Sequence, residues 1–464
     1  MAPAVLVQNP TIAPVTDTIK DKLNLKSYPA DLQAALDDAK AQFTKRNPNS
    51  LRLHEEAVNN LPGGNTRTLL YTTPFPLSMK SGKGHQVTDE DDHTYTDFVG
   101  ELTAGLYGHS NPNILSSLTN TISTIGLNLG ATTAAESRFA SLMRSRFNLG
   151  RVRFCNSGTE ANLHALAGAR KYTGKRKVVV FSGGYHGAVL SFGSGQPAEN
   201  NVDLDDWVLG RYNDVAGAKE LIEGLEGQLA AVLVEGMQGA GGCIIGTKEF
   251  LAQCQESAHK IGALFMLDEV MTSRLAPGGL QSLLSLTPDL TTFGKYLGGG
   301  LAFGAFGGST EVMSVYDPRQ PGSLAHSGTF NNNTLAMHAG YAGLHDVYKP
   351  EVCEEFSKNG DAFREKLNKA CEGTNCCFSG KGTIMAVHFS ADGEMKESDV
   401  TCVEVIKEDW ELKDLFWLEM MEEGYWISRR GTIAMILGTP QEELDRFVAA
   451  VESFLERHRN LVRS

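Results

Sequence analysis

Apolar residues follow two alternating patterns between residues 150 and 310 of this chain. Short, nearly continuous apolar runs are typical of strands that are buried on both faces of a parallel sheet. Between the earlier runs, apolar residues return every three or four positions, as on one face of an amphipathic helix. Strands that alternate with helices predict an α/β sheet covered by helices on both faces. The predicted strands cover residues 152–155, 177–181, 230–234, 263–267, 291–293 and 302–306.

Two helices have clear signals at their ends. Residues 247–261 begin with Thr247, a good N-cap, and are followed by Gly262, a residue type that often ends helices. The last helix is predicted to begin with Thr439 as N-cap and Pro440 at the first position, with Glu442 completing a capping box. The chain is therefore expected to end in a helix that packs its apolar face on the protein.

The pattern changes on both sides of the central region. After about residue 340 helices predominate, and strands are predicted only near 383–389 and 433–437. Upstream, residues 32–43 predict a helix within an N-terminal arm, and residues 79–98 read as short strands joined by turns. We therefore predict three parts: an N-terminal arm with part of a small domain (1–90), a large α/β domain (91–340) and a C-terminal small α+β domain (341–464).

The composition excludes two classes of partner. The 464 residues include 42 Lys and Arg against 55 Asp and Glu, a formal net charge of −13. An acidic chain without a basic block binds nucleic acids and anionic membranes poorly. The eight cysteines form no CxxC pair and read as reduced thiols. Because the start MAPAVLVQNP is unlike a signal peptide and no apolar run is long enough to span a bilayer, we expect a cytoplasmic protein.

Three polar positions follow predicted strands, where open α/β sheets bind ligands. The sequence NSGTE at 156–160 opens a helix, so it suits either a phosphate or an ordinary N-cap. Asp268 ends another strand and is either a ligand-binding carboxylate or a capping residue. Lys295 lies between an apolar run and a glycine-rich segment. It is either desolvated, with a lowered pKa that suits a Schiff base, or an exposed loop residue.

Two loops offer further contacts to a ligand. Tyr185 follows a strand end and either stacks on a planar ring or packs on its own domain, and the polar loop 327–331 can supply a hydroxyl group. Motifs of dinucleotide, P-loop, serine hydrolase and zinc protease sites are absent from the sequence.

Together these segments resemble the class III aminotransferases, which are fold-type-I enzymes of pyridoxal 5'-phosphate (PLP). Residues 234–333 look especially like the β-phenylalanine aminotransferases, in the branch that contains glutamate-1-semialdehyde aminomutase. The matching segments are NSGTEA (156–161), GGYHG (183–187), LDEV (267–270), the GK pair that ends at Lys295, and HSGTF (326–330).

The resemblance implies a fold and a set of residue roles. The fold is a large PLP-binding domain with a mostly parallel, seven-stranded sheet covered by helices, next to a smaller α+β domain. Lys295 would bind the cofactor covalently and move a proton between substrate and cofactor, and Asp268 would pair with the pyridinium nitrogen. The other implied cofactor contacts are Ser157, Gly158 and Thr159 at the phosphate, Tyr185 and Val270 on the two faces of the ring, and Thr329 from the neighbouring subunit of a homodimer.

Two arginines are implied to bind substrate carboxylates. Arg67 matches the position that holds the carboxylate of a β-amino acid, and Arg430 matches the one that receives the distal carboxylate of the keto acid. A guanidinium suits both tasks because it binds carboxylates through two parallel hydrogen bonds. Arg429 lies beside Arg430, so the register of the second assignment is open.

The implied activity is transfer of an amino group from an aromatic β-amino acid, such as β-phenylalanine, or a related amine to a keto acid such as 2-oxoglutarate or pyruvate. Two alternatives stay open: an aminomutase of the glutamate-1-semialdehyde type, and a PLP-binding protein without turnover. Retention of both Lys295 and Asp268 argues against the second alternative.

Overall fold

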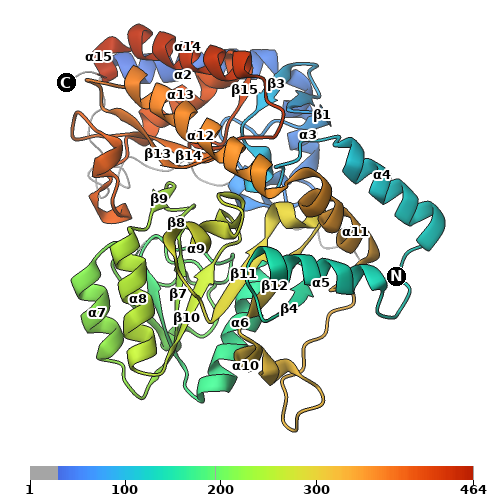
Figure 1. The fold of residues 1–464 in the computed structure, drawn as a ribbon. Helices are drawn as coiled ribbons and strands as arrows, with labels where there is room; N and C mark the ends of the chain where they lie inside the picture. Colours follow the sequence, from blue (N-terminus) through green and yellow to red (C-terminus); the bar gives the residue numbers. More distant parts are fainter. Residues whose placement is uncertain (1–29, 194, 463–464) are drawn as a thin grey trace, which may run out of the picture.

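The computed structural model describes residues 30–193 and 195–462. The first 29 residues, with most of the predicted N-terminal arm and the segment MAPAVLVQNP, lie outside the described residues. Figure 1 shows a large α/β region below and a region above it that combines the N-terminal and C-terminal parts of the described chain.

Seven strands of the described chain form the large sheet, in the order β4-β12-β11-β10-β7-β5-β6. Strand β12 is antiparallel to β4 and β11, and the other neighbours are parallel, which confirms the predicted mostly parallel sheet. The sequence analysis did not predict the edge strand β6. The bounds are β4 (Arg151–Cys155), β5 (Lys177–Phe181), β6 (Trp207–Gly210), β7 (Leu229–Glu235), β10 (Leu264–Asp268), β11 (Leu290–Gly294) and β12 (Gly304–Gly308).

Helices bury both faces of this sheet, as the continuous apolar runs predicted. Alternate residues of one strand face opposite sides, so Phe265 and Leu267 of β10 pack in the core under α7 (Val215–Glu223) and α8 (Lys248–Lys260). Leu264 and Met266 pack on the other side, in the core that contains alanines of α6 (Gly158–Thr173). The remaining helices of this region are α4 (Pro112–Asn120), α5 (Ala134–Arg146), α9 (Gly279–Leu284), α10 (Thr310–Met313) and α11 (Thr334–Ala342).

The upper region combines segments from both ends of the chain. β15 (Tyr425–Trp426) pairs with β3 (Thr94–Asp97), so a C-terminal strand completes an N-terminal sheet with β1 (Met79–Lys83) and β2 (Gln86–Asp89). A second sheet contains β13 (Cys376–Lys381), β14 (Ile384–Phe389) and β16 (Thr432–Ala434), the last shorter than the strand predicted near 433–437. The domain limits at residues 90 and 340 stay a prediction. The helices here are α2 (Ala30–Arg46), α3 (Pro48–Ala57), α12 (Pro350–Ala370), α13 (Trp410–Glu422), α14 (Gln441–Arg457) and α15 (Arg459–Val462).

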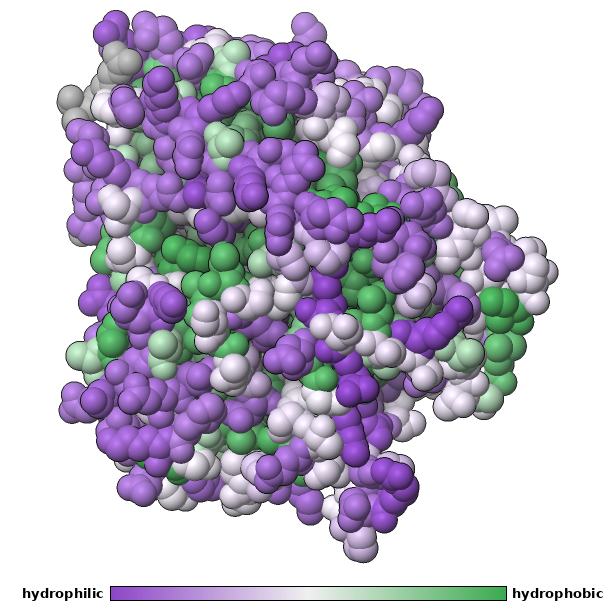
Figure 2. Space-filling view, in the orientation of Figure 1, coloured by the Kyte–Doolittle hydropathy of each residue, from purple (hydrophilic) through white to green (hydrophobic). Residues whose placement is uncertain are grey.

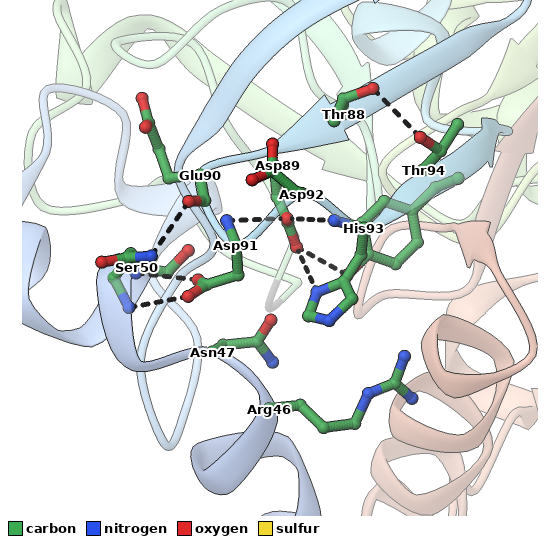
Figure 3. Close-up of polar contacts among 12 residues, drawn as sticks. Arg46, Asn47, Ser50, Thr88, Asp89, Glu90, Asp91, Asp92, His93 and Thr94 are labelled. Carbon is green, nitrogen blue, oxygen red and sulfur yellow. Dashed lines mark hydrogen bonds and ion pairs between the residues drawn. The ribbon is translucent and has the colours of Figure 1, made fainter.

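An acidic turn between β2 and β3 attaches the N-terminal helices to this sheet (Figure 3). The carboxylate of Asp91 accepts hydrogen bonds from the backbone N–H groups of Asn49 (2.8 Å) and Ser50 (3.0 Å) at the start of α3. Buried Asp89 accepts from the Tyr95 hydroxyl at 2.8 Å. A carboxylate at a helix N-terminus is favourable because it pairs with free N–H groups and the helix dipole.

The predicted cap of α8 is confirmed, and that of α14 is wrong. Thr247 accepts a hydrogen bond from the backbone N–H of Phe250 (3.1 Å). At α14, Pro440 itself is the N-cap, with an extended backbone and no side-chain cap. Because Pro440 keeps this extended backbone, the helix begins one residue later than predicted and Thr439 lies before the N-cap, where its hydroxyl donates to the carbonyl of Ile436 (2.8 Å).

Candidate active site

The carboxyl ends of the parallel strands bring the predicted site segments to one edge of the large sheet. Asp268 ends β10, and Lys295 directly follows β11. The helix α6 begins just after β4, and its first residue is in contact with the loop after β10, because a Cβ on Gly158 would lie 2.9 Å from both Cγ atoms of Val270. A Cβ on Gly187 would lie only 2.3 Å from Thr159 Oγ1, so the loop after β5 also packs here.

The start of α6 has the predicted N-cap, and its first N–H groups remain available to a ligand. Ser157 is the N-cap, and its Oγ accepts a hydrogen bond from the backbone N–H of Glu160 (3.1 Å). The first N–H groups of a helix have no partner within that helix. Those of Gly158 and Thr159 are therefore available to an anion, and the helix dipole favours a negative charge there.

Asp268 is 5% exposed and is held by three donors. Its Oδ2 accepts from Asn162 Nδ2 (2.8 Å) and from His186 Nδ1 (2.8 Å), and its Oδ1 accepts from the backbone N–H of Val270 (2.9 Å). Because a carboxylate only accepts, His186 carries its proton on Nδ1 in this arrangement. Asn162 Oδ1 in turn accepts from the Thr292 hydroxyl at 2.8 Å. The carboxylate is thus fixed in position by its donors.

Lys295 has the desolvated character that the sequence suggested. Burial lowers the pKa of its amine, and the charge of Arg67 lowers it further, whereas Asp268, Glu101 and Glu235 oppose the shift. Its backbone is left-handed, with φ of 58°, a conformation that non-glycine residues seldom adopt. Such backbone conformations persist where the surrounding structure holds them, often at active sites.

A second buried carboxyl lies next to Asp268. Glu235 ends β7 and is the register partner of Asp268 across the β10–β7 pair. Its Oε1 accepts from the backbone N–H of Tyr185 (2.8 Å), and its Oε2 from that of Gly239 (3.1 Å). Burial raises the pKa of Glu235 to about 7. This residue fixes the backbone of Tyr185, whose side chain is exposed.

The predicted substrate arginines differ in their surroundings. Arg67 is exposed and forms an ion pair with Glu101, and its charge acts on Lys295. Arg429 donates two hydrogen bonds of 2.6 Å to Asp414. Arg430 has no hydrogen bond or ion pair with any residue that the structure describes; partial desolvation lowers its pKa, and nearby Tyr185 opposes that shift. Arg430 is therefore the arginine of this pair that is free for a ligand.

Thr329 lies at the edge of the described site. It is exposed, in a loop joined to the start of α6 by the hydrogen bond from Asn156 Nδ2 to Asn331 Oδ1 (3.0 Å). It also lines a hollow of about 450 Å³ together with residues 127–132. Its predicted role at the cofactor of a neighbouring subunit stays a prediction.

Sequence reasoning missed four residues that shape the site. Glu235 had the same signal as Asp268, a carboxylate at the carboxyl end of a predicted strand. His186 lay inside a motif that was noted for its tyrosine. Asn162 on α6 and Glu101 had no local signal, because only their distant partners give them a role.

Comparison with known proteins identifies the family. A model of the family "Aminotransferase class-III" matches residues 71–452. The chain belongs to this family, and it is a PLP-dependent aminotransferase.

Three relatives are close over nearly the whole chain. An uncharacterized aminotransferase of Schizosaccharomyces pombe is 48% identical, over 95% of this chain and 99% of the relative. The β-phenylalanine transaminase of Variovorax paradoxus is 45% identical, over 92% of this chain and 98% of its own. The crystal structure of the β-phenylalanine aminotransferase from this organism has a TM-score of 0.90, covering 93% of this chain and 99% of that one. A glutamate-1-semialdehyde 2,1-aminomutase of Pelotomaculum thermopropionicum is 32% identical, over 87% and 98%.

The residues at the sheet edge fit PLP. The start of α6 has no side chain at Gly158, where a Cβ would collide with Val270, and its free N–H groups suit a phosphate. Asp268 is a fixed anion suited to a protonated ring nitrogen, and Lys295 is a desolvated amine suited to an aldehyde.

Proposed function

We propose that this aminotransferase takes its amino group from an aromatic β-amino acid, such as β-phenylalanine, or a related amine, and passes it to a keto acid such as 2-oxoglutarate or pyruvate. The observation that carries the proposal is the exposed guanidinium of Arg67, which pairs with a carboxylate, that of Glu101, and whose charge lowers the pKa of Lys295. A β-amino acid needs a cation set back from the reacting carbon, because its carboxylate is one carbon further out than in an α-amino acid. The similarity to β-phenylalanine transaminase supports the same donor.

The residues then divide the work. PLP, when bound, withdraws electrons from the carbon that bears the amino group and so loosens its proton. Lys295 Nζ, with its lowered pKa, is a base suited to accept that proton and would pass it from the substrate carbon to the cofactor. Asp268 holds the proton of the ring nitrogen, since an anion beside that nitrogen raises its pKa. Ser157, Gly158 and Thr159 bind the phosphate, while Tyr185 and Val270 enclose the ring.

Arg430 is proposed to receive the distal carboxylate of the keto acid. Arg429 already holds Asp414 through two hydrogen bonds, so binding a substrate there would require breaking that pair. Arg430 has no such pair to break, and it lies near Tyr185, which is proposed to contact the cofactor ring.

A donor screen against one keto acid tests the activity, followed by the absorbance of the cofactor. We expect turnover of β-phenylalanine that requires added keto acid. An aminomutase would convert its substrate without an acceptor, so acceptor-independent turnover would favour that alternative. Arg67→Ala should lower kcat/KM for the β-amino acid by about threefold to fivefold, the value of a partly exposed ion pair, and affect simple amines less. Equal damage to both donors would make Arg67 structural.

We further propose a homodimer with shared active sites. Exposed apolar side chains gather where α4 ends and the chain projects from the molecule, and Figure 2 shows the apolar patch at this edge. Contiguous exposed apolar surface is typical of protein interfaces. The hollow beside Thr329 continues this surface. The side chains concerned are Leu115, Ile122, Ile125, Leu127, Leu129 and Phe330.

Light scattering of the purified protein tests the dimer: the mass should be twice 50.2 kDa and should fall in Leu129→Asp. A wild-type monomer would refute it.

We also infer a cytoplasmic location, which the eight free cysteines support. No helix in the described part of the chain is long and apolar enough to cross a membrane.

A further inference from the structure

Arg67 already holds a carboxylate of its own chain. Its Nη1 pairs with Glu101 Oε1, although 34 residues separate the two. Neither side chain is buried, since the arginine is 41% and the glutamate 59% exposed. A donor carboxylate that binds Arg67 therefore meets an existing partner in a position open to exchange.

The backbone that carries Glu101 has an uncommon conformation. Gly100, Glu101, Leu102 and Thr103 have φ angles of 51°, 47°, 52° and 79°. Three of these four residues are not glycine, and a run of left-handed residues is unfavourable for L-amino acids because the Cβ crowds the backbone. Such a turn requires specific support from its surroundings.

The start of the turn is fixed from two sides. Asp97 Oδ1 accepts hydrogen bonds from the backbone N–H groups of Val99 (2.8 Å) and Gly100 (2.9 Å). Gly100 lies directly against the C-terminal region, because a Cβ there would be 2.6 Å from the carbonyl oxygen of Ala434. Only glycine combines this positive φ with so close an approach.

The end of the turn is tied by a buried arginine. Arg274 has no exposed surface; its Nη1 donates to the carbonyl of Thr103 (3.3 Å) and its Nη2 to that of Met435 (2.5 Å). Arg274 thus links the turn to the loop after β10 and to the C-terminal region. The backbone of Glu101 is therefore held in the conformation from which its carboxylate pairs with Arg67.

We propose that Glu101 is a specificity-determining residue for the amine donor: it neutralises Arg67 when no substrate carboxylate is present and is displaced when one binds. This inference rests on the proposed role of Arg67 in the donor site. An amine without a carboxylate then meets a neutral pair instead of an unpaired cation. The free energy that a β-amino acid gains on binding Arg67 is reduced by the free energy of the Arg67–Glu101 contact that it replaces.

Calorimetry with 3-phenylpropanoate, a carboxylate without an amine, measures this exchange on the holoenzyme apart from turnover. Glu101→Gln should tighten its binding about threefold to fivefold, the value of a partly exposed ion pair. The exposed Glu355→Gln is the matched control and should leave binding unchanged. In steady-state kinetics Glu101→Gln should lower KM for β-phenylalanine and lower kcat/KM for 1-phenylethylamine.

Unchanged or weaker binding of 3-phenylpropanoate in Glu101→Gln would overturn the inference. A residue that merely orients Arg67 would favour ligand binding, so its loss would not tighten it. Glu101→Asp, whose carboxylate stops one carbon short of Arg67, should tighten binding to a smaller degree and serves if the first variant does not fold. Arg67→Ala separates the two proposals. If it weakens binding while Glu101→Gln does not tighten it, only the role of Glu101 fails. If Arg67→Ala leaves binding unchanged, the proposed donor site fails.

Discussion

Replacement of Asp268 by Asn tests the centre of the site, because it removes a charge with little change of shape. The buried carboxylate accepts from three donors, His186, Asn162 and the N–H of Val270. An asparagine has one acceptor oxygen, so if that oxygen replaces Oδ2, its amide group faces the Val270 N–H and leaves that donor unsatisfied. We expect a loss of about 1–3 kcal/mol in the free energy of unfolding, with the fold retained.

We expect Asp268→Asn to change the rate of the reaction more than the stability of the fold. The ring nitrogen of PLP loses its anion in a desolvated site, a change worth about 2–4 kcal/mol, or roughly 30-fold to 900-fold in rate. Single-turnover absorbance of the amine half-reaction measures this rate, and thermal unfolding measures stability. Asp205→Asn, an exposed carboxylate outside the site, controls for the loss of one charge. A half-reaction rate within about threefold of wild type would refute the reasoning, since that is less than about 1 kcal/mol.

Three further predictions concern the neighbouring groups. Lys295→Ala should remove the visible absorption of the lysine–cofactor linkage and lower turnover by at least about 100-fold, because the base is lost; wild-type turnover would take Lys295 out of its role. Arg430→Ala should raise KM for 2-oxoglutarate by about tenfold or more and leave the donor half-reaction intact, whereas Arg429→Ala should chiefly lower the melting temperature, and the reverse pattern would exchange the two assignments. Buried Glu235 and Glu269, with pKa values raised to about 7, hold a proton more tightly in the folded than in the unfolded chain. Stability should therefore fall as pH rises from about 4.5 to about 7, by up to about 3 kcal/mol for each, and denaturant titrations should find a shallower fall in Glu235→Gln; an equal fall would contradict the assignment.

Local pattern was sufficient for much of the fold and for the two central residues. Apolar runs identified six strands of the large sheet, because a strand that is buried on both faces needs a nearly continuous apolar run. Strand ends are also local, and the carboxyl ends of parallel strands meet at one edge. The positions of Asp268 and Lys295 at that edge therefore followed from the sequence.

The tertiary structure decided which polar groups meet. Sequence spacing does not show that β7 lies beside β10, so Glu235 could not be placed next to Asp268. The same holds for β15, which joins β3 from more than 300 residues away in the chain. Even the start of α14 depended on the backbone of Pro440, whose extended conformation places the N-cap one residue after Thr439.

The two substrate arginines depended on tertiary structure for the same reason. Arg429 and Arg430 are adjacent in sequence and alike in chemistry, and only the position of Asp414 on α13 occupies the first and leaves the second free. Arg67 acquires its partner because Arg274 and Asp97 hold a left-handed turn that local propensity disfavours. Hydrophobic periodicity specifies which residues are buried, because burial depends on each residue's own side chain. A hydrogen bond or an ion pair depends on where a second, distant residue lies, and packing of the whole chain sets that position.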